Sequence, residues 1–514
     1  MADPILKFEP EQSKDSENVT LEGVISTFAK ELVIAICGPV GSAIHHVAER
    51  LEQQLNDVYD YDASTIKLSE FIKKHRRNKK TPLPEDKYEK TCLLIEEGDH
   101  LRGMHGASIL AELAIGEICI KRNTASEGGS GKEHLQPKRF CHIIDSIKND
   151  SELNLLRAVY SNLLVTVGVF SHKDERVKNL RASGMPDEKI YELIDLDSGE
   201  ELKSGQSVKD TFPKCDFFLN CEGENTNIID DKIERLLNIV TGSKITTPTA
   251  GERSMYHAYC AGLSSACLSR QVGAAVTDAD GNLLSVGWND VPRYDGGLYT
   301  AEHDPDNRCM NLEGGKCFND TEKRKLVKEI VQALGDIIPA PQKAEAEKVL
   351  GKSRVKQLLE FSRSVHAEMF AILNAGAEHY GGKIRGGQIY VTTYPCHNCA
   401  RHIIAAGIHK VFYIEPYPKS LALHLHGDAI TEDVNSQTKV RIVPFEGVGP
   451  AMFERFFRYP ESGRKNKDGK MISIPSRDAT FTSNFSIWSL PQLESKIVTD
   501  LKEKNLITAT DEEG

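Results

Sequence analysis

The chain has 514 residues, which is more than one hydrophobic core usually organises, so we expect two domains. It contains 39% hydrophobic and 27% charged residues, as is usual for a globular protein, and its longest apolar runs are much shorter than a membrane span. We therefore expect no membrane-spanning helix. The formal net charge of -11 disfavours a nucleic-acid polymer as the substrate, because binding a phosphate backbone normally requires a surplus of Lys and Arg.

Cysteine usage and the N-terminal segment predict a cytoplasmic location. The first residues, MADPILKFEPEQSKDSE, lack the basic start and the apolar stretch of a secretory signal. The twelve cysteines are scattered along the chain and do not form a dense disulfide framework, so most are expected to be buried thiols. Only Cys396 and Cys399 have the spacing of metal ligands.

A first α/β domain is predicted over residues 29–245. The run Leu32–Ile36 has the length and composition of a buried parallel strand, and the apolar positions between residues 44 and 55 recur at helical spacing. Further strands are predicted at 165–170 and 217–220, with helical stretches between them. This alternation favours a doubly wound parallel sheet.

The turn GPVGSA follows the first predicted strand and precedes a helix. Its backbone N–H groups and the positive end of the helix are suited to phosphate oxygens, so Gly38, Gly41 and Ser42 are candidate nucleotide contacts. No lysine follows these glycines as it does in the phosphate-binding sequence G-x-x-x-x-G-K-[ST], which makes phosphoryl transfer doubtful. The alternative is a plain strand-to-helix turn that needs glycine for close packing.

Loops and boundaries divide the rest of the chain. Residues 1–28 form an acidic N-terminal extension, and the segment 121–139, rich in Gly, Ser and charge, predicts a mobile surface loop. Small and turn-forming residues at 241–253 predict a domain boundary. A second domain is expected over 250–460, and no usable motif occurs in the C-terminal extension, 461–514.

The second domain has the predicted order α-β-β-α-β-α-β, with an irregular insertion before its second helix. The apolar patterns place a helix at 258–268, strands at 272–278 and 283–289, the insertion at 289–321, a helix at 365–375, a strand at 388–393, a helix at 399–406 and a strand at 410–414.

The strongest chemical signal in the chain combines His366-Ala367-Glu368 with Pro395-Cys396-His397-Asn398-Cys399. One imidazole and two thiolates fill three positions of a tetrahedral Zn²⁺ ion and leave the fourth open, as in catalytic sites. Zinc lowers the pKa of a bound water molecule toward neutrality, so hydroxide becomes available as a nucleophile. Glu368, two residues beyond the histidine, is the candidate proton shuttle; this signature is typical of zinc-dependent base deaminases.

Each half of this signature has a simpler interpretation when it stands alone. A C-x-x-C pair is often a structural zinc knuckle or a redox motif, and a single histidine on a helix is often packed or solvated. The two halves occur in order, about thirty residues apart and each at a helix start, which favours the catalytic interpretation. Since three ligands are already supplied, we expect His397 to lie outside the coordination sphere.

The insertion contains a further set of possible ligands. His303, Cys309 and Cys317 offer an imidazole and two thiols for a second, structural metal ion. Their spacing is not a standard one, and free buried cysteines are the alternative.

From about Met255 to at least Phe445 the chain resembles the cytidine and deoxycytidylate deaminase superfamily, in SRQVGAAV and VGWNDVP as well as in the zinc motifs. The resemblance implies that Asn289 contacts the sugar of a nucleotide and that the backbone at Ala367 and Pro395 holds the edge of the base. From the sequence alone, Asn289 is also a plain turn residue after a strand.

The N-terminal part, with GPVGSA, DASTIKLSEFI and IIDSIKNDSELNLLR, resembles a nucleoside-monophosphate-kinase-type P-loop domain. The joined arrangement resembles the bacterial anti-phage deaminases of dCTP and dCMP. This implies an α/β protein with an N-terminal P-loop kinase-like parallel sheet, helices on both its faces, and a three-layer α/β/α cytidine-deaminase-like domain. It also implies depletion of dCTP during phage infection, control by a nucleotide at the P-loop domain, and a homo-oligomer, by resemblance a hexamer.

Three hypotheses about function remain open at this stage. The first is attack of hydroxide on carbon 4 of cytosine in a free deoxycytidine nucleotide, with release of ammonia. The second is an editing deaminase for cytidine or adenosine in a polynucleotide, which would need basic grooves and stacking aromatics. The third is a nucleotide kinase fused to a deaminase, or a nucleotide-gated switch.

Overall fold

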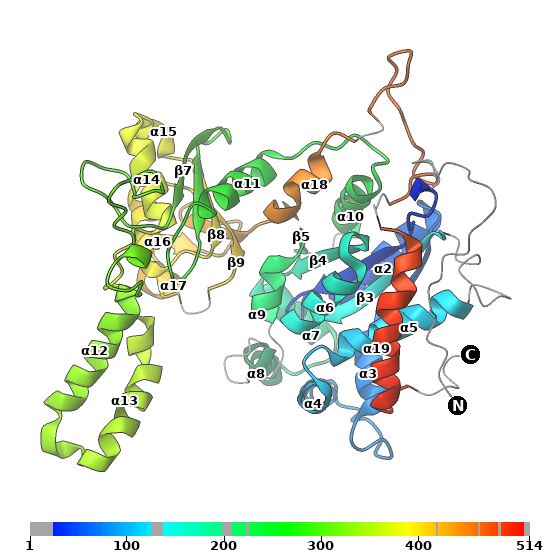
Figure 1. Ribbon diagram of the computed structural model, residues 1–514, viewed down its shortest axis with the longest axis horizontal. Helices are drawn as coiled ribbons and strands as arrows, with labels where there is room; N and C mark the ends of the chain where they lie inside the picture. The colour runs from blue at the N-terminus through cyan, green and yellow to red at the C-terminus, as the bar shows by residue number, and fades with distance from the viewer. Residues whose placement is uncertain are drawn as a thin grey trace, which may run out of the picture.

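The computed structural model describes residues 24–124, 137–197, 208–222, 226–417, 420–460, 463–481 and 485–507. Their strands form two six-stranded sheets, one on each side of Figure 1. The first sheet has the strand order β12-β5-β4-β1-β3-β2, and the second has the order β10-β11-β9-β8-β6-β7. The chain therefore contains two α/β units, as its length predicts.

The first sheet is parallel except for its edge strand β12, which runs antiparallel to β5. All six residues of β1 are buried, because helices and neighbouring strands cover this central strand, as its continuous apolar run predicts. Helix α2 (Ile44–Asp57) buries the apolar positions expected from its periodicity. The strands are β1 (Leu32–Cys37), β2 (Asp62–Lys67), β3 (Phe140–Ile147), β4 (Leu164–Phe170), β5 (Phe217–Asn220) and β12 (Gly447–Val448).

The second sheet is mixed: β6 is antiparallel to both of its neighbours, and the remaining pairs are parallel. Helices α11 (Ala250–Gly262) and α14 (Ala367–Ala377) pack against β6 and β7, and α16 (His397–Ala405) packs against α14. The strands are β6 (Gly273–Thr277), β7 (Leu283–Trp288), β8 (Gln388–Thr393), β9 (Lys410–Glu415), β10 (Ile430–Thr431) and β11 (Val440–Pro444).

A glycine sets how closely α14 approaches this sheet. A Cβ atom added at Gly287 would lie 2.5 Å from both the carbonyl oxygen of Ala367 and the backbone nitrogen of Ala371. Such a contact is far shorter than van der Waals distance, so only glycine allows the helix to sit at this depth. The first turn of α14 is thereby held against the sheet, where it carries the predicted metal and proton-transfer residues.

The prediction for the first helix of the second domain was wrong about its position. Helix α11 begins at Ala250, eight residues before the predicted start, because Thr249 and Glu252 form a reciprocal capping box there. The predicted boundary at 241–253 therefore includes the first turn of this helix. Residues 263–268, which were expected to be helical, lie beyond its end.

Helix occupies part of one predicted loop and also a stretch, 322–364, for which no element was predicted. Helix α5 (Ile109–Thr124) takes up the first residues of the segment 121–139; the positions 125–136 lie outside the described residues. Between β7 and α14 the chain forms a helical hairpin, α12 (Phe318–Ala333) and α13 (Lys343–Lys352), which projects from the second unit in Figure 1. Its helices pack on one another and bury few residues, so they show little of the apolar periodicity that core helices have.

The chain returns to the first unit after the second sheet. Gly447–Val448, which lie inside the predicted second domain, pair with β5. The backbone N–H of Val448 donates to Glu252 Oε1 at 2.9 Å, and Arg235 donates to Glu252 Oε2 at 2.6 Å. Glu252 is 1% exposed, so one buried carboxylate connects the start of the second unit with both parts of the first. The predicted domain limits stay predictions.

Helix α19 (Leu490–Glu503), in the C-terminal extension, packs on α5 of the first unit. Glu494 is fully buried there, accepts a hydrogen bond from Tyr160 Oη at 3.0 Å and pairs with Arg122, which also pairs with Glu31 at 2.7 Å. Figure 1 shows this helix in red beside the N-terminal elements. The last part of the chain thus completes the core of the first unit.

Among the described residues, no single helix has both the length and the apolar composition of a membrane span. One pair does so only when its two members are taken together, Lys87–His105 and Ile109–Asn123, which are bent by 87° from one another.

Candidate active site

Three side chains from two helix starts meet beside the second sheet. His366 immediately precedes α14, Cys396 immediately precedes α16, and Cys399 lies in the first turn of α16. His366 Nδ1 lies 3.2 Å from Cys399 Sγ and 3.4 Å from Cys396 Sγ. Within the described ranges, these three residues are the only group of three or more His, Cys, Asp or Glu side chains arranged to share a metal ion.

The geometry of this group fits zinc. Tetrahedral Zn²⁺ with bonds of about 2.3 Å to sulfur and about 2.0 Å to nitrogen holds its ligand atoms roughly 3.5 Å apart. The observed nitrogen–sulfur separations are close to this value, and all three ligand atoms lie within 4.8 Å of one another. Three protein ligands leave one position open, as a catalytic centre requires.

The protonation equilibria of the three ligands are strongly coupled. The Cys396 thiol has its pKa lowered to about 4, first by a hydrogen bond from Cys399 and then by the His366 imidazole. The same contact with Cys396 raises the pKa of His366 to about 9. Binding of a dication requires neutral imidazole and thiolates, so these protons are released when the metal binds.

Glu368 lies in the first turn of α14 and is 4% exposed. Burial raises the pKa of its carboxyl group, and the neighbouring Cys396 raises it further. A carboxyl group whose pKa is closer to neutrality is better suited to accept and return a proton at physiological pH. Its position beside the thiols agrees with the predicted proton shuttle, a role that stays a prediction.

A cleft with a volume of about 550 Å³ leads to these residues. His366, Ala367, Glu368 and Cys396 lie on its wall. Its size is in the range of small-molecule sites, roughly 300–1,000 Å³. The cleft can therefore admit a nucleotide to the metal ligands and to the buried carboxyl group.

Comparison with known proteins identifies the family. Residues 249–415 match the family described as the cytidine and deoxycytidylate deaminase zinc-binding region. The deoxycytidylate deaminase of Enterobacteria phage T4 is 30% identical over 174 residues, which cover 32% of this chain and 76% of the phage protein. The chain belongs to the cytidine and deoxycytidylate deaminase family. It is therefore a zinc-dependent deaminase, a hydrolase that acts on a C–N bond of cytosine.

Two further proteins resemble parts of this deaminase. The ComE operon protein 2 of Bacillus subtilis (strain 168) is 48% identical over 56 residues, 11% of this chain and 29% of that protein. The solved dCMP deaminase from the cyanophage S-TIM5, in complex with dCMP and dUMP, is 21% identical, with a TM-score of 0.23; the match covers 39% of this chain and 98% of that chain.

Asn289 follows β7 and lines the cleft of the deaminase. Its Oδ1 accepts the backbone N–H of Val272 at 2.7 Å, and its Nδ2 donates to the carbonyl oxygen of Arg270 at 2.9 Å. Both ends of the amide thus hold the segment before β6 in place. The predicted contact with the sugar stays a prediction, and the structure adds a positioning role for this residue.

The other predicted substrate contacts differ in position. Ala367 lies on the cleft wall, whereas Pro395 is outside the set of residues that line it. The carbonyl oxygen of Pro395 accepts a hydrogen bond from Ser420 Oγ at 2.8 Å. His397 is half-buried and stands apart from the ligand group, as expected. The proposed base contacts stay predictions.

The structure does not bring His303, Cys309 and Cys317 together as a second metal group. The Nδ1 atom of His303 accepts the backbone N–H of Thr300 at 3.0 Å instead. Both cysteines line the catalytic cleft, and so does Cys267, which sequence reasoning missed because it lies about forty residues earlier in the chain. Cys309 is half-buried and free, and partial burial raises the pKa of its thiol.

The turn at residues 38–42 has a packing role. A Cβ atom at Gly38 would lie 2.4 Å from the carbonyl oxygen of Val169, and Gly41 has a φ of +83°. Ile44, the first residue of α2, is buried. Ser42 Oγ is buried and has no hydrogen-bond partner in the described parts of the chain. These observations support the structural interpretation of the glycines and leave the phosphate contact as a prediction.

Two charged residues near this turn were not found from the sequence. Lys148, which follows β3, donates from Nζ to the carbonyl oxygen of Gly38 at 2.6 Å. Asp145, near the end of β3, is 3% exposed and lies 2.5 Å from Nδ1 of His45. Neither residue is near the turn in sequence, so only the parallel pairing of β3 with β1 reveals their proximity.

Proposed function

We propose that this enzyme deaminates free deoxycytidine nucleotides, dCMP and dCTP, to dUMP and dUTP with release of ammonia. The observation that carries the proposal is the group His366, Cys396 and Cys399 beside buried Glu368, in a chain that is 30% identical to a phage deoxycytidylate deaminase over 174 residues. The two phage relatives named as deoxycytidylate deaminases, those of T4 and T2, support a nucleotide with a 5′-phosphate as the substrate.

The reaction is a hydrolysis: water adds at carbon 4 of cytosine, the bond to the exocyclic amine breaks, and ammonia and the uracil nucleotide are the products. Zinc held by the three ligands supplies a Lewis acid that lowers the pKa of water toward neutrality. Glu368 carries one proton of the water to the ring nitrogen and then the second, from the new hydroxyl group on carbon 4, to the departing amine. Its burial keeps bulk water away from this proton transfer.

Cationic side chains near the metal ligands support a phosphorylated substrate. Arg270, Lys323 and Arg363 line the same cleft. Arg363 has no carboxylate within ion-pair distance among the described residues; it donates to the carbonyl oxygen of Asn307 at 3.2 Å and lies over the ring of Phe318. A guanidinium without an acidic partner is suited to a phosphate group.

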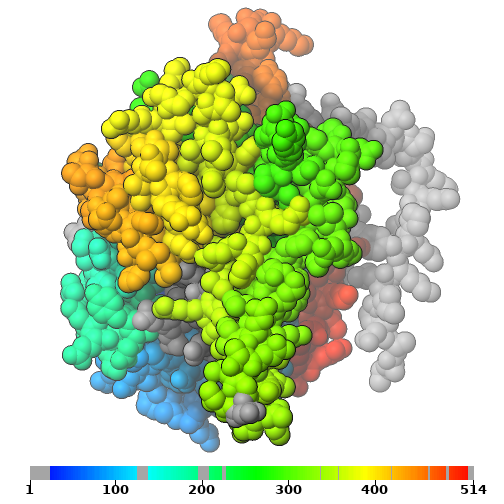
Figure 2. Space-filling view, turned by 90° about the vertical axis from the view of Figure 1, so that its left-hand side faces the viewer, coloured from blue at the N-terminus to red at the C-terminus, as the bar shows by residue number. Residues whose placement is uncertain are grey.

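A second groove supports an extended anion in place of a monophosphate. It runs along the hairpin of α12 and α13, which crosses the face shown in Figure 2 in yellow-green, and it shares Asp320 and Lys323 with the catalytic cleft. Its charged lining comprises Asp320, Lys323, Arg324, Lys325, Lys328, Glu347, Lys348 and Lys356. The excess of cations favours dCTP, and it is also the observation that favours the alternative, a polynucleotide substrate.

One panel separates these substrates: ammonia release from dCTP, dCMP, cytidine, adenosine and single-stranded DNA, with zinc quantified in the same sample. We expect release from dCMP and dCTP only, with one zinc ion per chain. Release from single-stranded DNA alone, with steep loss of binding as salt increases, would contradict the proposal in favour of an editing deaminase.

We further propose that the enzyme acts in antiviral defence, by depleting dCTP when a phage infects a bacterium. The support is the resemblance of the two-part chain to anti-phage deaminases. Cells that express the wild-type chain are expected to lose dCTP and to reduce phage yield, whereas cells that express Glu368→Gln are not. An equal phage yield in the two strains would refute this role.

The remaining expectations concern the first unit and the assembly. We propose that the parallel sheet with the turn at 38–42 is a P-loop-type domain that binds a regulatory nucleotide without transferring phosphate. Transfer of labelled phosphate from ATP to dCMP would instead indicate a kinase. We also propose a homo-oligomer, a hexamer by resemblance, to be measured by light scattering, and a cytoplasmic location, which the twelve free cysteines support.

A further inference from the structure

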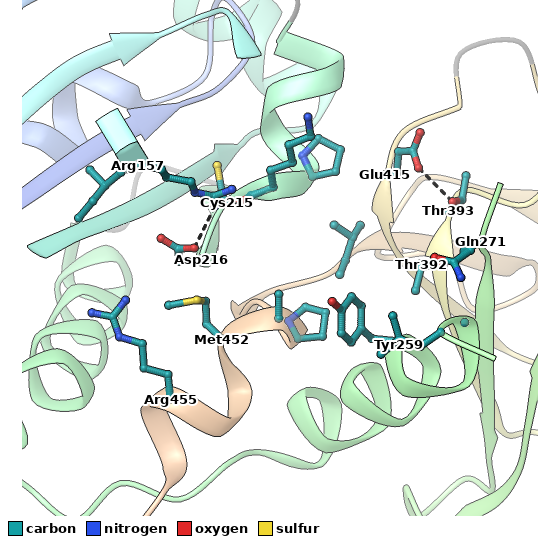
Figure 3. A pocket seen from close by; sticks show the side chains of 18 of the residues that line it. Arg157, Cys215, Asp216, Tyr259, Gln271, Thr392, Thr393, Glu415, Met452 and Arg455 are labelled. Carbon is teal, nitrogen blue, oxygen red and sulfur yellow. Dashed lines mark hydrogen bonds and ion pairs between the residues drawn. The ribbon is translucent and has the colours of Figure 1, made fainter. Parts of the chain in front are cut away.

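The two units face one another across a cavity of about 700 Å³ (Figure 3). The ion pairs on its two walls each lie within one unit. On the wall of the first unit, Arg157 pairs with Asp216 at 3.2 Å. On the wall of the deaminase unit, which contains the second sheet, Glu415 accepts from Arg270 at 2.8 Å and from Thr393 at 3.2 Å. The first unit reaches the catalytic cleft by a different contact.

That contact joins a histidine of the first unit to a carboxylate of the deaminase unit. His172 follows β4 and immediately precedes α7 (Lys173–Ala182). Its Nε2 atom lies 3.8 Å from Oε2 of Glu432, which follows β10. The imidazole is 25% exposed and the carboxylate is 36% exposed, so water screens this pair only in part.

Helix α7 holds the histidine in a fixed place on the first unit. Arg176 Nε donates to the carbonyl oxygen of Val40 at 2.7 Å, and Asn179 Nδ2 donates to the carbonyl oxygen of Gly41 at 2.9 Å. Val177 of the same helix is buried. Because these contacts anchor α7 to the turn after β1, the start of the helix is a firm support for His172.

Glu432 binds the wall of the catalytic cleft with its other oxygen. Tyr394 Oη donates to Oε1 of Glu432 at 3.0 Å. Tyr394 lines the cleft, lies two residues before the metal ligand Cys396 and is 8% exposed. Its ring packs on that of Tyr413, with the centroids 4.9 Å apart. One carboxylate thus connects His172 of the first unit with a side chain on the wall of the cleft.

The charge of His172 decides how firmly Glu432 is held. Within the described ranges, no other cation lies within ion-pair distance of this carboxylate. Contact with Glu432 raises the pKa of the imidazole above its ordinary value; burial opposes this, and the charges of Asp174 on α7 and Glu222 after β5 add to it. The charged groups that face the imidazole are therefore all acidic. When the imidazole is neutral, Glu432 is free to turn toward water, and the hydroxyl group of Tyr394 loses its acceptor, which is costly for a buried group.

We infer that His172 is a positioning residue of the deaminase, supplied by the first unit: through Glu432 it fixes Tyr394 and so the shape of the wall that receives the substrate. This wall is the same before and during the reaction, so its displacement weakens binding of the substrate and of the transition state alike. The expected defect is a higher KM with little change in kcat. The first unit thus contributes to substrate binding and needs no ligand of its own to do so.

The first test compares a neutral and a cationic replacement in the full-length, zinc-loaded enzyme. With dCMP as the substrate, His172→Gln should raise the KM roughly three- to tenfold, as expected for the loss of about one hydrogen bond, and should keep kcat and the zinc content. His172→Lys, which keeps a cation beside Glu432, should restore most of the wild-type KM. The matched control is His105→Gln, at the end of α4 (Lys87–His105) in the first unit, which should leave the KM unchanged.

The dependence of KM on pH separates an effect of charge from a general loss of packing. His172 is protonated below its raised pKa, so the wild-type KM should be lowest there and should rise as the pH increases through that value. His172→Lys stays charged over the same range, because the pKa of lysine is about 10.4, and should lack this rise. His172→Gln should have a high KM throughout. Other groups that titrate in the cleft are common to all three enzymes and cancel from the comparison.

The second test asks whether Tyr394 carries the effect. Tyr394→Phe removes only the hydroxyl group and should raise the KM by a similar factor. In the double variant, His172→Gln with Tyr394→Phe, the KM should be no higher than in the more affected single variant, because both changes break the same connection. Glu432→Gln, whose side chain is 36% exposed, replaces His172→Gln if that variant does not fold.

Three outcomes would overturn the inference. A wild-type KM in both His172→Gln and Glu432→Gln would show that the contact has no effect on the cleft. A His172→Lys enzyme as impaired as His172→Gln would show that the charge is not needed. Effects of His172→Gln and Tyr394→Phe that multiply in the double variant would show that the two residues act separately. Failure of the proposed function is a different result: if the wild type deaminates another cytosine substrate and not dCMP, the same variants are compared on that substrate, and the same outcomes decide the inference.

Discussion

The metal centre and the glycine turn occupy comparable places in the two units, since each lies where the chain enters a helix beside a sheet. At the metal centre the reactive groups are side chains, and the residues of the helix starts bring a nitrogen and two sulfur atoms within 4.8 Å. At the turn the backbone follows the expected order of strand, glycine turn and helix. The first residue of the helix, however, is Ile44, whose side chain is buried in the core. A backbone can therefore keep its shape while the chemistry-bearing side chains differ.

The largest expected effect comes from removing a metal ligand, which should abolish both zinc binding and activity. In Cys399→Ser the zinc content should fall from one ion per chain toward zero, and ammonia release should fall with it, because a hydroxyl is a poor zinc ligand. Zinc is measured by mass spectrometry on the purified protein. Cys260→Ser, which lies outside the metal group, is the control and should keep both.

The next largest effect separates the proton shuttle from the metal. Glu368→Gln should retain zinc but lose roughly 10²–10⁴-fold in kcat, as is typical when a general acid–base group is removed. Glu378→Gln, exposed at the other end of the same helix, should leave kcat unchanged. A Glu368→Gln enzyme with wild-type kcat would show that another group moves the proton.

A smaller effect tests whether the C-terminal helix belongs to the first unit. Leu501, which is fully buried, lies 3.1 Å from the position of a Cβ atom at Gly116 of α5. Leu501→Ala should lower the free energy of unfolding by about 2–5 kcal/mol. The loss should appear in the denaturant-induced transition of the first unit, with the zinc content unchanged.

The control for this prediction lies on the same helix. Leu493 is 41% exposed, and Leu493→Ala should change stability by less than about 1 kcal/mol. If Leu501→Ala instead destabilised only the deaminase unit, the two units would not be separated as the sheets suggest.

The smallest effect concerns the turn itself. Ser42→Ala should leave the unfolding free energy unchanged, because Ser42 Oγ makes no hydrogen bond within the described residues. If the turn binds phosphate, the affinity of the variant for ATP should fall by up to about tenfold, because one hydrogen bond contributes about 0.5–1.5 kcal/mol. Unchanged ATP affinity, measured by calorimetry, would make the turn purely structural.

Much of the central fold could be predicted from the sequence. The strands β5 and β8 have the predicted bounds, and β1 and β4 differ by one residue, because continuous apolar runs bounded by turns are strong local signals. The strand β2 was missed because DASTIK is polar, and α11 was displaced because the capping box lies within a segment of turn-forming residues. The strand β3 was missed although FCHIIDSI is mostly buried. The hairpin α12–α13 was missed because its helices bury few side chains and so lack a clear apolar periodicity.

The candidate site divides in the same way. The candidate ligands His366, Cys396 and Cys399 could be found by residue type and spacing, because metal ligation restricts both, whereas the role of Glu368 stays a prediction. The predicted contact of Asn289 with a sugar stays a prediction, and the structure adds that both ends of its amide hold the backbone at Arg270 and Val272. Hydrogen bonding of this kind depends on which segments pack together, and spacing along the chain does not encode it.

By itself, the sequence of this protein determined the metal, its ligands and the class of chemistry, since these depend on a few residues close together in two short motifs. Tertiary structure alone decided where the C-terminal helix packs, that Lys148 and Asp145 lie beside the turn, and that Arg270 meets Glu415. These facts depend on contacts between residues far apart in the chain. Such contacts form only when the sheets and helices pack, and no local pattern records them.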